Sequence, residues 1–260
     1  MSGPALELFP DKAEDRTYRP SFQFDGDDLG RAHLAAEDRV RHLPGWLRRE
    51  DVLKLYELAY FANGSILEIG SYHGKSAIIM AGAARDSGCG ATVFSLDVDT
   101  NALRPARKAA ADQGVADNVI FVRGSVRAFF RAWRGFEPSL VFVDGDHSYR
   151  GVSRDLQVLR SRVPRGAMIL FHDFNDPLNG EPRDAEVAVR EAVLESWVAE
   201  DCDFGGVFGA CGLFVRRRGA EEPQANPPLI DLLVFDSVRM QYRQRLRRPL
   251  GRALRRLRSR

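Results

Sequence analysis

Short apolar runs alternate with longer helix-like segments through the middle of the chain. The runs hold mostly Val, Ile, Leu and Phe, which is typical of strands that are buried on both faces of a parallel sheet. We expect five such strands, at residues 65–69, 91–96, 119–122, 140–143 and 168–171. We expect helices between them, at residues 76–84, 102–113, 125–133 and 151–163. This alternation predicts an α/β fold with a doubly wound, mostly parallel sheet.

The pattern changes on both sides of this core. After it, residues 186–198 predict one more helix, and the short strands 206–208 and 212–216 flank a turn. They favour an antiparallel hairpin at the C-terminal edge of a seven-stranded sheet. Before the core, residues 27–62 predict two helical segments around a break at 43–47. The expected domains are an N-terminal arm with a helical extension, one α/β domain, and a linker with a basic tail, over residues 1–43, 44–217 and 218–260.

The composition fits a chain with one sizeable core. Of the 260 residues, 44% are apolar, and no apolar stretch approaches the roughly 20 residues that cross a bilayer. The first 25 residues mix apolar and charged side chains and lack the continuous apolar segment of a signal peptide, so we expect a cytoplasmic location. Three cysteines without CxxC spacing argue against a disulfide framework and against a zinc site.

The C-terminal tail carries the opposite charge from the rest of the chain. After Asp236 there are ten arginines and no acidic residue, so the remainder is net acidic although the whole chain is at +2. Leu250, Leu254 and Leu257 would share one face of a helix, and a basic helix with such a stripe binds anionic lipid. The tail is therefore expected to be either a solvated extension or a peripheral contact with the inner face of a membrane. Nucleic acid is not expected as a partner, because aromatic residues hardly occur in the tail.

Acidic side chains follow four of the expected strands. Ligands of such sheets bind beyond the carboxyl ends of the strands, where we find Glu68, Asp97, Asp144 and the pair His172–Asp173. One aspartate at a strand end is as easily a cap as a ligand, but four acidic strand ends on one edge indicate a binding site. Asp97 has the position of the carboxylate that binds a ribose diol in nucleotide-binding folds, with Asp99 as the nearby alternative.

The loop after the first strand has two glycines, Gly70 and Gly74, before a helix. Glycine there allows close approach of the backbone to a ligand. The spacing G-x-x-x-G lacks the G-x-G-x-x-G pattern of dinucleotide-binding loops. A phosphate-binding P-loop needs a glycine at position 69, which is isoleucine, and Glu68 would repel a polyphosphate. The loop therefore suits a cationic ligand that carries hydroxyl groups.

Three segments of this sequence resemble one enzyme family. Residues 66–77, 141–149 and 171–173 are similar, in order and spacing, to the motifs of class I S-adenosylmethionine-dependent methyltransferases. The resemblance is strongest to the catechol O-methyltransferase-like branch and to the sugar O-methyltransferases of macrolide biosynthesis. It covers roughly residues 44–217 and implies a Rossmann-like methyltransferase sheet that binds S-adenosyl-L-methionine.

The resemblance also implies roles for individual positions. Asp97 would bind the ribose of the cofactor, and Gly124 with Ser125 would cover the adenine edge. Asp144 would lie near the cofactor as well. The remaining cofactor contacts would come from the loop after the first strand and the start of the next helix, at Glu68, Gly70, Ser71, Tyr72, Gly74 and Ser76. By their adjacency to the motif alone, Trp46, Tyr72, His73 and the segment 175–183 are expected to form the acceptor pocket.

The resemblance places a divalent cation, Mg²⁺ or Mn²⁺, at Asp144 and the pair His172–Asp173. The first member of that pair is usually a carboxylate in the branch, and here it is an imidazole. This change either shifts the preference from magnesium toward manganese, iron or zinc, or removes the metal and leaves His172 or His147 to act alone. His147 lies three positions beyond Asp144, where the catechol-type enzymes have their general base, and histidine suits that role near neutral pH.

These features together predict O-methylation of a hydroxyl group on a sugar, a glycolipid or another small molecule, with Asp144 and His147 as catalytic residues. Two other classes of function stay open at this point. One is a non-catalytic protein with this cofactor fold that docks at membranes through its tail. The other is a P-loop nucleotide hydrolase. The sequence does not name the acceptor, and it leaves a homo-oligomer open.

Overall fold

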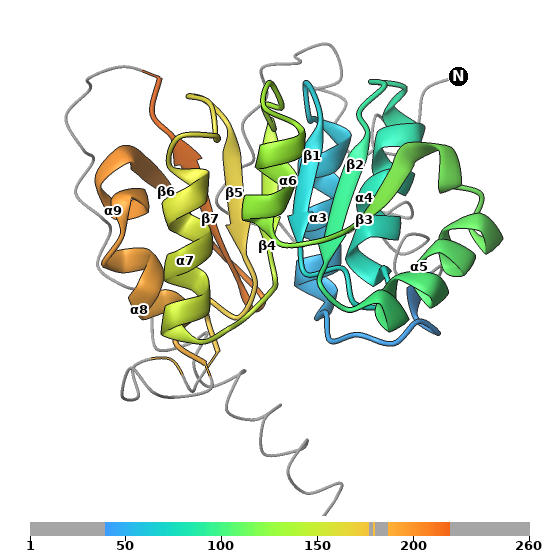
Figure 1. The fold of residues 1–260 in the computed structure, drawn as a ribbon, viewed down its shortest axis with the longest axis horizontal. Helices are drawn as coiled ribbons and strands as arrows, with labels where there is room; N and C mark the ends of the chain where they lie inside the picture. Colours follow the sequence, from blue (N-terminus) through green and yellow to red (C-terminus); the bar gives the residue numbers. More distant parts are fainter. Residues whose placement is uncertain (1–39, 177–178, 180–186, 219–260) are drawn as a thin grey trace, which may run out of the picture.

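The computed structural model describes residues 40–176, 179 and 187–218 (Figure 1). The expected polar arm, the first helical segment of the extension and the basic tail lie outside these described residues. The domain boundaries given above therefore remain a prediction. Within the described ranges, no helix combines the length and the apolar character needed to span a bilayer.

A seven-stranded sheet forms the centre of the fold, in the order β3-β2-β1-β4-β5-β7-β6. The first five strands are parallel, and β7 pairs antiparallel with both β5 and β6. The strands are β1 (Ile66–Ile69), β2 (Val93–Asp97), β3 (Val119–Arg123), β4 (Leu140–Val143), β5 (Met168–Phe171), β6 (Cys202–Phe208) and β7 (Cys211–Arg216). This confirms the expected seven-stranded sheet with an antiparallel C-terminal hairpin.

Helices cover both faces of the sheet (Figure 1). One core holds side chains of α3, α4 and α5, and the other holds side chains of α6, α7, α8 and α9. Successive strand residues alternate between the two cores: Ile66 packs into the first and Leu67 into the second. The helices are α3 (Arg49–Tyr60), α4 (Lys75–Ser87), α5 (Thr100–Asp112), α6 (Val126–Ala132), α7 (Tyr149–Leu159), α8 (Val189–Leu194) and α9 (Trp197–Asp201), with a 3₁₀ turn, η3 (Ala116–Asn118). Burial on both faces explains why the sequences of the parallel strands are continuous apolar runs.

The single helix expected over 186–198 is wrong. The described part of that segment forms two short helices, α8 and α9, with a break at Ser196. The Ser196 side chain accepts a hydrogen bond from the backbone N–H of Val198 and so caps the start of α9. Serine competes with helical backbone bonding in this way, which an apolar periodicity alone does not reveal.

The order in which successive strands are added to the sheet reverses between β1 and β4. From β1 the sheet extends through β2 to β3, and from β4 it extends the other way through β5. The carboxyl ends of β1 and β4 therefore diverge into connections on opposite faces, which leaves a crevice at this point of an α/β sheet. The predicted ligand-binding edge of the sheet lies at this crevice.

Candidate active site

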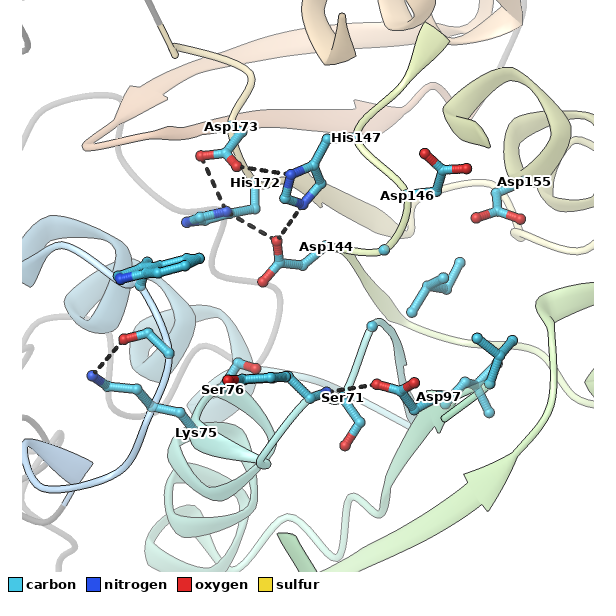
Figure 2. A pocket seen from close by; sticks show the side chains of 18 of the residues that line it. Ser71, Lys75, Ser76, Asp97, Asp144, Asp146, His147, Asp155, His172 and Asp173 are labelled. Carbon is cyan, nitrogen blue, oxygen red and sulfur yellow. Dashed lines mark hydrogen bonds and ion pairs between the residues drawn. The ribbon is translucent and has the colours of Figure 1, made fainter. Parts of the chain in front are cut away.

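A cavity of about 870 Å³ opens at the carboxyl ends of the parallel strands. Figure 2 shows that polar side chains from several of these ends point toward it. Most of the residues predicted from the sequence line its wall: Gly70, Ser71, Tyr72, Ser76, Asp97, Gly124, Ser125, Asp144, His147, His172 and Asp173. Trp46 of the expected acceptor pocket also lines it. Glu68, Gly74 and His73 do not belong to the wall that the structure describes.

Gly70 is required by the packing of the protein against itself. Its φ is +96°, and a Cβ added at this position would lie 2.0 Å from the carbonyl oxygen of Asp144. Gly74 has φ +80°, and a Cβ there would lie 3.0 Å from the Cβ of Ala106 in α5. This glycine therefore lets α4 start close to α5, and its expected close approach to a ligand stays a prediction.

The backbone amides of the loop after β1 are already used within the protein. Gly70 and Ser71 both donate to the carbonyl oxygen of Leu96, at 2.9 Å each. Tyr72 donates to Asp97 Oδ2 at 2.7 Å, and Gly74 donates to the carbonyl oxygen of Ser71 at 2.8 Å. A P-loop instead directs such amides at phosphate oxygens. The hydrolase alternative is therefore not favoured.

Glu68 lies beneath the cavity and supports the loop from below. Its carboxyl is fully buried and accepts hydrogen bonds from the hydroxyl groups of Ser76 and Ser95. Burial raises the pKa of Glu68 to about 8, although the two serine hydrogen bonds oppose this rise. The carboxyl therefore keeps its proton near neutral pH. The expected contact between Glu68 and the cofactor stays a prediction, and the structure shows the contacts of Glu68 with the two serines.

Asp97 lies in the cavity wall with both carboxylate oxygens fixed by backbone donors. Oδ2 accepts the N–H of Tyr72, and Oδ1 accepts the N–H of Asp99 at 2.8 Å. The side chain of Asp99 faces α5 instead, where it caps the helix by accepting the N–H of Asn101. Of the two carboxylates considered for the ribose, Asp97 is thus the one that the fold directs at the cavity. Its role in ribose binding stays a prediction.

Four titratable side chains from β4, β5 and the loops that follow them converge at one end of the cavity (Figure 2). His147 Nε2 lies 3.3 Å from Asp144 Oδ1, and His147 Nδ1 lies 3.2 Å from Asp173 Oδ2. His172 Nδ1 lies 3.0 Å from Asp144 Oδ1 and 3.3 Å from Asp173 Oδ1. We call this group the carboxylate–imidazole cluster. Its members were all predicted from the sequence, and the fold brings all of them together.

Within the carboxylate–imidazole cluster, the carboxylates and the imidazoles stabilise the charged forms of one another. Burial disfavours the charged form of His172, but the carboxylates of Asp144 and Asp173 outweigh it and raise the pKa of His172 well above its usual value. Burial also opposes ionisation of Asp144 and Asp173, yet the imidazoles lower the pKa of both carboxyl groups. The hydrogen bond that His147 donates to Asp144 raises the pKa of His147 against the effect of burial. Both aspartates are therefore ionised at neutral pH.

The backbone is strained at two points of the cavity wall. Tyr72 and Asp173 have positive φ values of 43° and 53°, and they are the non-glycine residues with positive φ among the described residues. Side chains beyond glycine rarely adopt this region, and such strain persists where the surroundings impose it, often at functional sites. Tyr72 is 55% exposed, and its ring stacks on His73 with ring centroids 4.1 Å apart.

The donor set of the carboxylate–imidazole cluster fits a divalent cation. One oxygen or nitrogen atom from each of the four residues lies within 4.8 Å of the others. His172 is buried, and neither of its ring nitrogens makes a hydrogen bond of good geometry, although carboxylates lie close to both. Two carboxylates with one or two imidazoles suit manganese, iron or zinc better than magnesium.

Sequence reasoning missed three acidic residues around the site. Asp51 of α3 is fully buried, and its Oδ2 lies 3.6 Å from His172 Nε2. Asp146 and Asp155 line the other end of the cavity, and burial raises the pKa of Asp155 to about 6. Asp51 and Asp146 lie at or near helix starts, where acidic residues are common for reasons of helix stability. Their local sequence therefore gives no signal of a binding role.

Comparison with known proteins identifies the middle of the chain. A family described as a methyltransferase domain matches residues 67–174. Rv0187 from MTB, solved with a cofactor bound, shares 24% identity at a TM-score of 0.55, over 84% of this chain and 99% of that chain. The O-methyltransferase TomG from Streptomyces achromogenes, solved with S-adenosylmethionine, shares 19% identity at a TM-score of 0.53, over 75% and 92% of the two chains.

An O-methyltransferase from Bacillus cereus, solved in complex with SAH, shares 17% identity at a TM-score of 0.52, over 71% of this chain and 89% of that chain. At these identities the structures establish the fold, and the family match identifies a methyltransferase domain within residues 67–174. The matched residues run from β1 to just beyond β5, so they contain the loop after β1 and the whole carboxylate–imidazole cluster. Residues 67–174 thus match a methyltransferase domain, and the chain as described has the fold of these methyltransferase structures.

Proposed function

We propose that the protein transfers the methyl group of S-adenosyl-L-methionine to a hydroxyl oxygen of a small molecule. The observation that carries this proposal is the placement of His147 in the cavity wall between two ionised carboxylates, Asp144 and Asp173. A hydroxyl oxygen is a weak nucleophile until its proton is removed, and an imidazole held in this way suits proton removal. The O-methyltransferases of similar fold support the choice of oxygen as the acceptor atom.

The cofactor is proposed to lie along the loop after β1, with its ribose at Asp97 and its adenine near Gly124 and Ser125. Asp97, Gly124, Ser125 and residues of the loop after β1 line the same cavity. The structures of TomG with S-adenosylmethionine and of the Bacillus cereus enzyme with SAH support the cofactor assignment. The methyl-bearing sulfur would then face Asp144 and the carboxylate–imidazole cluster.

In the proposed reaction, His147 accepts the proton of the acceptor hydroxyl while the oxygen attacks the methyl carbon in line with the carbon–sulfur bond. The bond to sulfur breaks, its electron pair stays on sulfur, and S-adenosylhomocysteine leaves. One of the two aspartates accepts the N–H of the neutral His147 ring, and the acceptor hydroxyl takes the place of the other at the second ring nitrogen. Both carboxylates stabilise the imidazolium that forms. Alignment of the two reactants by the cavity is worth up to about 7–11 kcal/mol in well-positioned reactions.

A divalent cation would be held by Asp144, His172 and Asp173, with Mn²⁺ preferred to Mg²⁺ because an imidazole is among the ligands. When bound, such a cation lowers the pKa of a hydroxyl group that coordinates to it. His147 then remains the group that takes the proton. Its Nδ1 and Nε2 both face carboxylates, so the same aspartates orient the base and the cation.

The acceptor is proposed to be a sugar, a glycolipid or another hydroxylated small molecule. Trp46 lies in the cavity wall with 80% of its surface exposed, so its ring is available to a flat ligand face. Sugar rings and aromatic rings both bind well to exposed aromatic side chains. A glycolipid acceptor would also agree with a membrane contact through the arginine-rich tail, which lies outside the described residues.

Calorimetry with S-adenosylhomocysteine and with ATP tests the proposal first. We expect binding of S-adenosylhomocysteine in the micromolar range and no binding of ATP. Turnover of labelled cofactor over hydroxylated sugars, glycolipids and phenols then identifies an acceptor. With that acceptor, His147→Ala should lower kcat at least about 100-fold and leave cofactor affinity unchanged. His42→Ala serves as the control, because His42 is exposed and lies outside the cavity wall.

Each outcome separates the alternatives. ATP binding without S-adenosylhomocysteine binding would instead support the alternative function of a P-loop nucleotide hydrolase. Cofactor binding with no turnover of any acceptor would favour a non-catalytic protein of this fold. Full activity in both His147→Ala and Asp144→Ala would show that the carboxylate–imidazole cluster is not the catalytic group.

A further inference from the structure

A buried carboxylate lies behind the carboxylate–imidazole cluster, on a helix that precedes the matched methyltransferase residues. Asp51, in the first turn of α3, has 0% of its surface exposed. Its Oδ1 accepts the N–H of Ala210 at 2.8 Å, and its Oδ2 accepts the N–H of Arg48 at 2.6 Å. Burying an ionised carboxylate is costly unless it is paired or hydrogen-bonded. The two amide donors therefore hold Asp51 in one fixed orientation.

The surrounding chain leaves room for this carboxylate. A Cβ added to Gly209, in the turn between β6 and β7, would lie 2.4 Å from Asp51 Oδ1. Gly209 has φ +61°, so a side chain there would be disfavoured by the backbone as well. Asp51 thus joins α3 to the β6–β7 turn through a contact that only glycine permits.

His172 lies between Asp51 and the rest of the carboxylate–imidazole cluster. Its Nδ1 faces Asp144 at 3.0 Å, and its Nε2 faces Asp51 at 3.6 Å. Figure 2 shows the second ring nitrogen of His172 pointing away from Asp144 and Asp173. The Cys211 thiol also lies near this nitrogen, and burial raises its pKa well above the usual value, so it stays neutral. Within the described residues, the Asp51 carboxyl group lies on the Nε2 side of the ring.

We propose that Asp51 is a positioning residue that accepts the Nε2–H of His172 and thereby directs the Nδ1 lone pair at a divalent cation between Asp144 and Asp173. This inference rests on the cation site of the proposed function and adds a residue outside the matched domain to it. Metal-binding histidines commonly donate their other ring N–H to a carboxylate, which fixes the tautomer and the ring orientation. A movement of about 0.5 Å would bring the present 3.6 Å separation into hydrogen-bond range.

A purely structural role for Asp51 makes a different prediction. Oδ2 already accepts the Arg48 N–H and so caps the start of α3, and this role alone would affect helix stability and nothing at the cation site. The Asp51→Asn substitution would keep one side-chain oxygen as an acceptor for a backbone amide. The new NH₂ group cannot accept the Nε2–H of His172, so the tautomer with Nδ1 free for the cation would lose its support.

The decisive experiment titrates Mn²⁺ into the full chain and measures free Mn²⁺ by electron paramagnetic resonance, without any acceptor. We expect Asp51→Asn to weaken Mn²⁺ binding about 10–100-fold relative to the wild-type protein. Glu50→Gln, one residue earlier in the same helix turn and exposed, should leave the affinity unchanged. An Asp51→Asn protein that folds and binds Mn²⁺ within about twofold of wild type would overturn the inference.

A second measurement covers the case in which Asp51→Asn does not fold. Long-range ¹H–¹⁵N spectra of the wild-type protein with Zn²⁺ report the tautomer of each histidine. We expect His172 to carry its proton on Nε2, with Nδ1 coordinated, and the opposite tautomer would overturn the inference. Wild-type protein that binds neither cation would overturn both the inference and the cation site. The methyl-transfer proposal is judged separately, by S-adenosylhomocysteine binding and by the His147→Ala variant.

Discussion

The α-carbon of Gly70 lies so close to the carbonyl group of Asp144 that a Cβ at position 70 would be 2.0 Å from the carbonyl oxygen. The two residues follow β1 and β4, the neighbouring strands at which the sheet reverses its direction of growth. This contact brings the loop that is proposed to hold the cofactor next to the strand end that carries the carboxylate–imidazole cluster. It therefore connects the two halves of the site.

Gly70→Ala should disrupt this junction. The new methyl group would collide with backbone that cannot move aside, and φ +96° disfavours any side chain. We expect a loss of about 3 kcal/mol or more in the free energy of unfolding, with loss of S-adenosylhomocysteine binding in any folded fraction. Chemical denaturation and calorimetry measure the two effects.

Gly88→Ala is the matched control for this substitution. Gly88 also has positive φ, at +62°, but a Cβ there would meet nothing within 4 Å. We expect a cost of about 1 kcal/mol and normal cofactor affinity. Equal effects of the two substitutions would show that backbone strain, and not the contact with Asp144, is what Gly70 relieves.

Asp97→Asn tests the assignment of the ribose contact. The amide keeps one oxygen for a backbone donor but loses the charge that strengthens hydrogen bonds to ribose hydroxyls. We expect S-adenosylhomocysteine affinity to fall about tenfold, which corresponds to ~1.4 kcal/mol. Asp99→Asn is the control, because that side chain caps α5. A larger loss of affinity for Asp99→Asn than for Asp97→Asn would reverse the assignment.

Glu68→Gln should change how stability depends on pH. The Glu68 carboxyl keeps its proton in the folded state up to a pKa of about 8, whereas in the unfolded chain it loses the proton near its ordinary value of 4.5. The folded state therefore binds an extra proton between these values, and stability falls as pH rises, by up to about 1.4 kcal/mol per pH unit. Above a pH of about 8 this contribution stops changing.

The glutamine variant lacks that contribution. The difference in free energy of unfolding between Glu68→Gln and wild type should shift in favour of the variant as pH rises from 4.5 to about 8. Urea denaturation at several pH values across this interval measures it, and the other titrating groups cancel in the difference. A difference that stays constant with pH would mean that Glu68 is not buried in its neutral form.

Trp46→Ala should affect the acceptor and not the cofactor. Trp46 lies in the cavity wall with 80% of its surface exposed, so removal of its side chain costs little packing. We expect the acceptor KM to rise about tenfold, with unchanged S-adenosylhomocysteine affinity, because stacking on aromatic side chains is worth on the order of 1 kcal/mol. Trp133→Ala, at a tryptophan outside the cavity wall, controls for the loss of one tryptophan. Weakened cofactor binding in Trp46→Ala would place the cofactor in this part of the cavity instead.

The strand ends were the most predictable part of the site. Asp97, Asp144, His172 and Asp173 end or follow buried apolar runs, and parallel strands bring such residues to one edge regardless of the loops between them. Glu68 differs from these residues because it belongs to β1 itself, and its buried carboxyl group accepts hydrogen bonds from Ser76 and Ser95. The position of a residue in a motif did not reveal which way its side chain faces.

The sequence by itself determined the alternation of strands and helices, the seven-stranded sheet and the identity of the carboxylate–imidazole cluster, because these depend on local periodicity and on the order of residues along the chain. Only the tertiary structure decided what surrounds them. Gly74 proved to serve helix packing, and the loop amides proved to be occupied by Leu96 and Asp97. Asp51 reached His172 from a helix more than a hundred residues earlier in the chain. Such contacts arise from packing between distant segments, which leaves no periodic trace in the sequence around either partner.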